Sequence, residues 1–261
     1  MSDRFCRTVC FLGSFVYAPM AQAETIHYDL FWGGLHLAEV SLSDQQRTVG
    51  YHLRLRSTTH GMFADLSGLM ISAESWGQRT DAASMAPNRF EVDTRDDDGE
   101  NRLAVEYSPD IVARVVLDLT TGNDGRNDDE PPRPPVPPEL RRQTLDPLSA
   151  PAVLGRSVIA KAAGGQTDHL LLPIYDGRQR YDVRADIKGP QTTTVHDRAL
   201  SGIAVELTFL PMAGFHEDSR VSWDNARFNV LINPDNGLPL HVVSENTAVA
   251  TVINLAVPKD E

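Results

Sequence analysis

The chain has 261 residues, and 24 Lys and Arg stand against 36 Asp and Glu, which gives a net charge of −12. This acidic balance argues against nucleic acid and anionic lipid head groups as partners, and it favours solubility. Both cysteines, Cys6 and Cys10, lie within the first ten residues. A chain processed beyond them has no thiol, which excludes disulfides, thiolate metal sites and cysteine nucleophiles.

The N-terminus has the pattern of a secretory signal peptide. Arg4 and Arg7 form a basic start, a short apolar stretch follows, and Ala21-Gln22-Ala23 supplies small residues for cleavage. The apolar stretch is shorter than the roughly 20 residues that a membrane-spanning helix needs. We therefore expect cleavage after Ala23, export to the periplasm, and a product that does not span the membrane.

Much of the remaining chain, residues 24–261, alternates between apolar and polar side chains, as half-buried strands do. Three strands are predicted before residue 60, and turn sequences such as Gly33-Gly34 and Asn233 to Gly237 separate strands. The later predicted strands are 71–76, 89–94, 102–107, 111–119, 169–174, 180–188, 192–196, 203–210, 220–223, 227–233, 238–244 and 247–257. All-β chains of this length are often undivided, so we expect a single domain.

Residues 122–142 interrupt the strand pattern. An acidic run from Asn123 to Glu130 is followed by the proline-rich stretch Pro131 to Pro138. Such a sequence has little to bury and favours an extended polyproline conformation, so we expect a disordered loop. The acidic run does not fit the spacing of a twelve-residue calcium-binding loop, so no calcium site is expected there.

One helix is predicted to begin at Asp146. Asp146 suits the N-cap, Pro147 the first helical position, and Gly164-Gly165 the end. Its apolar stripe is expected to consist of Leu148, Ala152, Val153, Ile159 and Ala160. A curved sheet and a single helix each need the apolar face of the other. The expected fold class is therefore mainly β, with an antiparallel sheet curled into an incomplete barrel or spiral around one short helix.

The segment from Tyr175 to Asp182 is denser in hydrogen-bonding groups than a hairpin requires. Asp176-Gly177 is a turn dipeptide, and the alternation places Arg178, Arg180 and Asp182 on one face and Tyr181 on the other. The favoured interpretation is a bidentate Arg–carboxylate pair that fixes the strand register, and the alternative is the binding of an anionic ligand.

The indoles Trp76 and Trp223 are predicted to anchor the core, and the alternative is that they line a ligand cavity. The candidate ligand-binding residues are thus Trp76, Trp223, Tyr175, Arg178 and Arg180.

The sequence has no serine-nucleophile elbow, phosphate-binding loop, dinucleotide fingerprint or zinc-protease motif. Its eight histidines are scattered without metal-ligand spacing. We therefore expect no catalytic residue, no metal and no cofactor.

Three segments resemble the domain-of-unknown-function 3108 family of exported bacterial envelope proteins. They are Tyr28 to Gly34, the Asp-Pro-Leu-Ser-Ala sequence from Asp146 to Ala150, and Tyr175 to Asp182; Glu74 to Gly77 and Trp223 also fit. The resemblance implies a periplasmic sheet curled around a helix, similar in shape to lipoprotein carriers, and it supplies no catalytic residue. The residues expected to form its structural motif are Asp146, Pro147, Ser149, Asp176, Gly177, Tyr181 and Asp182.

The function expected is non-enzymatic maintenance of the cell envelope, with a lipid, an acyl chain or a lipoprotein bound in the concave face of the sheet. One alternative is a scaffold that recruits another envelope protein through a sheet edge or the proline-rich loop. A third hypothesis is a hydrolase that uses Asp146, Asp176 or Asp182.

Overall fold

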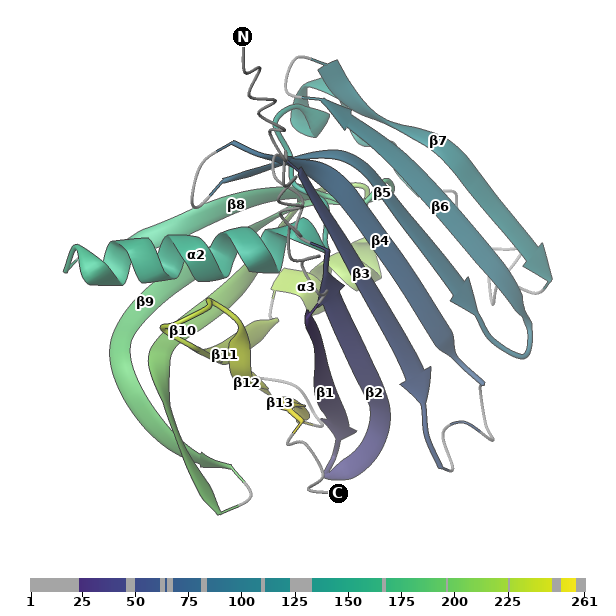
Figure 1. Ribbon diagram of the computed structural model, residues 1–261. Helices are drawn as coiled ribbons and strands as arrows, with labels where there is room; N and C mark the ends of the chain where they lie inside the picture. The colour runs from purple at the N-terminus through teal and green to yellow at the C-terminus, as the bar shows by residue number, and fades with distance from the viewer. Residues whose placement is uncertain are drawn as a thin grey trace, which may run out of the picture.

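The computed structural model describes residues 24–45, 50–61, 64, 68–80, 84–108, 111–122, 133–165, 168–195, 197–224, 226–245 and 250–256. Thirteen strands in this part of the chain form one antiparallel sheet that curls around a helix (Figure 1). The expected fold class is confirmed. The expected signal peptide lies outside the described residues.

The strands are β1 Glu24–Trp32, β2 Leu35–Asp44, β3 Gly50–Thr59, β4 Met70–Arg79, β5 Met85–Arg95, β6 Gly99–Ser108, β7 Ile111–Gly122, β8 His169–Tyr175, β9 Arg180–Val195, β10 Arg198–Ala213, β11 Arg227–Ile232, β12 Pro239–Glu245 and β13 Thr251–Leu255. The helical segments are the 3₁₀ helix η1 Pro138–Arg141, α2 Ser149–Ala163 and α3 Glu217–Asp224. Among the described residues no helix has the length and apolar character needed to cross a membrane.

The strand order has two halves that meet in the middle of the sheet. One half contains β7 to β1 in decreasing order, and the other contains β13 to β8 in decreasing order. The halves are joined where β1 pairs with β13. The free edges of the sheet are therefore β7 and β8, and the seam of the curled sheet lies between them. Leu145 covers part of the β8 edge, because its N–H donates to Pro173 O at 2.8 Å and its C=O accepts from Tyr175 N at 3.0 Å.

The long strands β9 and β10 bend around α2 (Figure 1). Their register shifts between Ala204 and Val205, close to Gly189, whose φ is 101°. Bulges bend a strand without ending it. The prediction of separate strands at 180–188 and 192–196 was therefore wrong, because 180–188 and 192–195 both belong to β9 and residue 196 lies outside the described residues.

The predicted strand at 220–223 was also wrong, because these residues lie in α3. The N–H of Arg220 donates to His216 O at 2.9 Å, as in a helical turn. The turn carries Trp223 onto the rings of Tyr181 and Phe215, at centroid distances of 5.0 and 5.3 Å. Burial of the indole thus outweighs the weak strand pattern of this short segment.

The buried face of α2 matches the predicted stripe only in part. Leu148 is buried, and Ala152, Val153 and Ile159 are half-buried against the core clusters, whereas Ala160 is exposed. The buried residues of the helix are Ser149, Ala150, Leu154, Gly155 and Val158. Gly155 lies against the backbone of Gly237, where an added Cβ would stand 1.9 Å from Gly237 O. Because glycine has no side chain, Gly155 does not show up in a pattern of apolar residues. Its lack of a side chain is what lets the helix approach Gly237.

The part of the expected disordered loop from 133 to 142 has a defined structure, and residues 123–132 lie outside the described residues. Val136 packs against the core of the N-terminal half, and Leu140 O accepts a hydrogen bond from Arg180 Nε at 2.9 Å. Residues of η1 lie beside β7. Proline loses little backbone freedom on ordering, so few contacts suffice to hold this stretch.

The core consists of three clusters that α2 connects. Leu148 packs among the residues of β3 to β7, Ala150 among those around Tyr181, and Val158 among residues of β8 to β11. The helix therefore joins both halves of the sheet, as a single helix inside a curled sheet is expected to do.

Candidate functional site

An apolar cavity of about 330 Å³ lies between the first half of α2 and the strands β8 to β13. Its lining residues are Pro147, Ala150, Pro151, Leu154, Leu172, Ile174, Tyr181, Val183, Leu207, Phe209, Phe228, Val230, Ile232, Gly237, Pro239, Val242 and Ile253. Among the described residues of this lining, Tyr181 is the one with a polar side-chain group. Small-molecule pockets have volumes of about 300–1,000 Å³, so this cavity is at the lower end of that range.

Mostly small side chains at the start of α2 face larger ones of the sheet across the cavity. Pro147, just before the helix, and Ala150, Pro151 and Leu154 within it form the helical wall, and residues of the strands point at them. Tyr181 and Val183 do so from β9. The lining can hold an apolar chain, and it offers no charged group for proton transfer.

Gly237 closes the cavity at the turn between β11 and β12. Its φ is 77°, and its N–H donates to Asn233 O at 2.9 Å. Its backbone touches Gly155 of α2, which fixes the distance between the helix and the sheet. A backbone contact between the helix and the β11–β12 turn therefore borders the cavity.

The Asp146 carboxylate fixes the start of α2. It is fully buried, and Oδ1 accepts hydrogen bonds from the N–H groups of Leu148 and Ser149, each at 2.8 Å. Oδ2 accepts from Ser75 Oγ at 2.8 Å and from Ser149 Oγ at 2.7 Å. Burial raises the pKa of Asp146, and these hydrogen bonds oppose the shift. Asp146 precedes the N-cap residue, Leu148, so the capping side chain was identified correctly but not its position.

The turn after β8 is held by the motif residues. Asp176 Oδ1 accepts from the N–H groups of Arg178 and Gln179, at 2.7 and 2.5 Å, and Tyr175 donates its hydroxyl to Gly177 O at 2.8 Å. Burial raises the pKa of Asp176. Gly177 has φ 100°, and an added Cβ would stand 2.7 Å from Val105 of β6. The turn therefore requires glycine at position 177, and it packs against β6 on the other side of the seam.

Arg180 and Asp182 form an ion pair through one contact, because Arg180 Nη1 lies 2.7 Å from Asp182 Oδ1, but these two atoms do not meet in hydrogen-bond geometry. The predicted bidentate pair is therefore not formed, and both residues belong to β9, so the contact does not link two strands. Arg180 also donates from Nε to Leu140 O, which ties β9 to η1. Arg178 instead pairs across the seam with Asp118 of β7, with Nη2 and Oδ1 2.6 Å apart. Arg180 therefore links β9 to η1, whereas Arg178 links the β8–β9 turn to β7 across the seam.

A second, polar cavity of about 320 Å³ lies at the seam. It is lined by Tyr175 and Arg178, which the sequence indicated, and by Arg133 and Arg141, which it did not. The Nε atoms of the three arginines are buried and hydrogen-bond to none of the described residues. The Asp118 carboxylate also lines this cavity and pairs with Arg178, so the excess positive charge comes from Arg133 and Arg141. Arg133 and Arg141 were missed because they fall in the stretch expected to be disordered.

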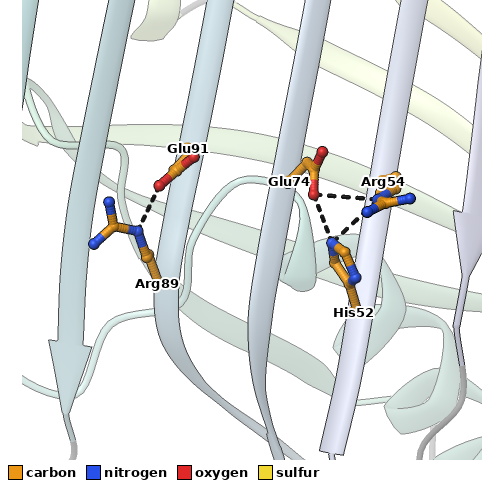
Figure 2. Close-up of polar contacts among 5 residues, drawn as sticks. All are labelled: His52, Arg54, Glu74, Arg89 and Glu91. Atoms are coloured by element: carbon orange, nitrogen blue, oxygen red, sulfur yellow. Dashed lines mark hydrogen bonds and ion pairs between the residues drawn. The ribbon is translucent and has the colours of Figure 1, made fainter.

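Trp76 was predicted to anchor the core, and the structure places it elsewhere. It stacks on His52 across β3 and β4, with ring centroids 4.8 Å apart, on the face opposite the core. Figure 2 shows the polar group beside it: His52 Nε2 lies 2.6 Å and Arg54 Nε 3.2 Å from the same Glu74 oxygen. Trp76 therefore lines no part of the apolar cavity, because strand alternation turns it outward.

Polar side chains continue onto β5 on the same face. There Arg89 Nε donates to Glu91 Oε1 at 2.5 Å (Figure 2). Trp223, by contrast, packs behind the cavity wall, with its ring 5.3 Å from that of Phe209. The binding of a ligand by the five residues indicated by the sequence stays a prediction.

One group of described residues could hold a metal ion. Asp29, His36 and Glu39 offer ligand atoms that all lie within 4.8 Å of one another. They come from β1 and β2, and pairing of these strands brings them together. Their distances along the sequence gave no metal signature.

The fold and cavity define a class of β-sheet proteins that curl around one helix and enclose an apolar space. The chain belongs to the family described as Protein of unknown function (DUF3108), whose profile matches residues 27–244. The resemblance seen in the sequence is thereby confirmed. Among curated proteins, none matches the chain.

Two solved structures are similar over most of the chain. One is a β-barrel-like protein of the domain of unknown function DUF1849 from Brucella abortus, with a TM-score of 0.54 and 13% identity over 90% of this chain and 95% of that one. This likeness supports the fold alone. The other is a candidate lipoprotein from Parabacteroides distasonis, with a TM-score of 0.33 and 7% identity over 91% of this chain and 95% of that one, too low to argue from.

Proposed function

We propose that this protein is a non-enzymatic component of the bacterial cell envelope that binds an acyl chain of a lipid or lipoprotein in the cavity beneath α2. The observation that supports this most directly is a lining of apolar side chains interrupted by a single hydroxyl. The signal-peptide pattern supports action in the periplasm.

The cavity can supply useful but limited affinity. Transfer of one methylene from water to an apolar site contributes about 0.8 kcal/mol, so ten methylenes contribute about 8 kcal/mol before the cost of immobilising the chain. Such a sum corresponds to a dissociation constant in the micromolar range or weaker. This affinity suits a carrier that releases its ligand.

The two buried carboxylates favour a structural role over hydrolysis. Both oxygens of Asp146 accept two hydrogen bonds each, from donors that position the helix. Asp176 accepts two backbone N–H groups within its own turn. Groups engaged in this way hold the fold and are poorly placed to activate water.

Neighbouring valines of β12 provide a matched test. Val242 lines the cavity, and Val243 points to the opposite face of the strand. We expect Val242→Trp to fill the space and abolish binding of a fluorescent fatty acid such as cis-parinaric acid. We expect Val243→Trp to leave binding unchanged, because it adds the same ring outside the cavity.

Circular dichroism of both variants checks that they fold. Native mass spectrometry of the wild-type protein from a periplasmic extract then tests whether a lipid co-purifies with it. Equal probe binding by the two variants would contradict the proposal. So would a wild-type protein that binds no acyl probe and carries no lipid.

A further inference from the structure

Four potential metal ligands gather at one place on the outer face of β1 to β3. Asp29 of β1 pairs in register with Glu39 of β2, and its neighbour Tyr28 is buried on the inner face. A bulge after Leu30 brings His36 within reach, with Nε2 3.3 Å from Asp29 Oδ1. Three strands thus converge here, because His60, directly after β3, places its Nε2 3.6 Å from Glu39 Oε2.

The spacing of these atoms fits a tetrahedral ion. Metal–ligand bonds of about 2.1 Å place the ligand atoms of a tetrahedral site about 3.4 Å apart. The two measured contacts, 3.3 and 3.6 Å, lie on either side of this value. Asp29, His36 and Glu39 all keep their ligand atoms within 4.8 Å. His60 adjoins this group through Glu39, and its half-exposed ring can supply the fourth ligand if it turns toward the ion.

The two imidazoles of the proposed site lie beside each other. The rings of His36 and His60 stack at 5.6 Å with an interplanar angle of 9°. The Nε2 atom of His60 is shielded from solvent and makes no hydrogen bond within the described residues. A shielded nitrogen without a hydrogen-bond partner calls for an explanation, and an ion is one.

We propose that Asp29, His36, Glu39 and His60 bind a divalent transition-metal ion of the Zn²⁺ class. Two imidazole nitrogens and two carboxylate oxygens suit Zn²⁺, whereas Ca²⁺ and Mg²⁺ require oxygen ligands alone. The ion cross-links β1, β2 and the end of β3. It stabilises the N-terminal strand that joins the two halves of the sheet, because a ligand bound only by the folded state stabilises it. This site departs from the expectation of no metal.

Zn²⁺ titration of the full exported protein tests the proposal. The protein is purified without a histidine tag, stripped with a chelator and titrated with ZnCl₂ by calorimetry. We expect one Zn²⁺ per chain and a rise in Tm, with no comparable response to Ca²⁺ or Mg²⁺. A chain loaded with Co²⁺ instead should show the visible absorption of a tetrahedral site.

Single substitutions locate the ion. We expect His36→Ala and His60→Ala each to weaken Zn²⁺ binding by about 100-fold or more, since losing even outer-shell partners of a metal costs 10–100-fold. His169→Ala is the matched control, because His169 is an exposed histidine on β8, and it should bind as the wild type does. The proposal is overturned if the wild type does not bind Zn²⁺, or if both ligand variants bind it with wild-type affinity.

Discussion

At the scale of single residues, Asp146 connects the start of α2 to the N-terminal half of the sheet. Its Oδ2 atom accepts from Ser75 of β4, which lies 71 positions away in sequence, and from Ser149 in the helix. The capping role was predictable from Asp146 and Pro147. The partner on β4 was not, because nothing local to either residue specifies the other.

Replacement of Asp146 by Ala should be strongly destabilising. It leaves two hydroxyls and two backbone N–H groups buried without an acceptor, so we expect the free energy of unfolding to fall by about 3 kcal/mol or more. Asp146→Asn should cost less, because its carbonyl oxygen can still accept the N–H groups of Leu148 and Ser149. Chemical denaturation of both variants and of the control Ser149→Ala measures the difference. If the Ala variant lost no more stability than Ser149→Ala, the carboxylate would not hold the helix.

At the scale of elements, the position of α2 depends on its contact with the β11–β12 turn. Gly155 meets Gly237 backbone to backbone, so the buried face of the helix is centred on a residue that has no side chain. The apolar stripe in the sequence therefore predicted the helix and one side of its buried face, but not the centre of that face. The same contact borders the cavity.

The substitution Gly155→Ala tests whether this contact or helix propensity has the larger effect on stability, because the two change the free energy of unfolding in opposite directions. Propensity alone predicts stabilisation by about 1 kcal/mol. The added Cβ, however, would stand 1.9 Å from Gly237 O, a backbone atom that cannot rotate away. Overpacking costs about 1–3 kcal/mol, so we expect a net loss of stability and a lower Tm. A more stable variant would show that the helix and turn can separate freely.

At the scale of the whole molecule, the sheet is held shut at its seam by a few contacts from different elements. Tyr107 of β6 donates its hydroxyl to Tyr175 O, Arg178 pairs with Asp118, and Leu145 bonds to the β8 edge. The strand β7 pairs with β6 alone, whereas β9 and β10 are paired on both sides. Stability should therefore be uneven around the sheet.

Amide hydrogen exchange can measure this asymmetry. Peptides from β7 should exchange faster than peptides from β9 and β10, because one edge of β7 has no neighbouring strand. A bound fatty acid should slow exchange in α2 and β9 to β12 and leave β3 to β5 unchanged, since only the former line the cavity. Uniform exchange around the sheet would contradict the open seam. Equal protection of both halves would argue against binding in the cavity.

Local patterns in the sequence determined the mainly β class, the single central helix, the turn at Asp176-Gly177 and the pair formed by Arg180 and Asp182. Each depends on residues a few positions apart, whose alternation, capping or turn chemistry acts within one element. The family resemblance rested on the same short segments.

Only the tertiary structure decided where the cavity lies, which arginines meet at the seam, and that His36 and His60 stack beside two carboxylates. These sites combine residues from strands far apart in sequence. Strand pairing and a glycine contact bring these residues together. Neither produces a regular pattern of residues in the sequence from which the site could be predicted. Trp76 faces outward because alternation along β4 turns Ala73 and Ser75 toward the core, and which of the two faces is buried is decided by the fold.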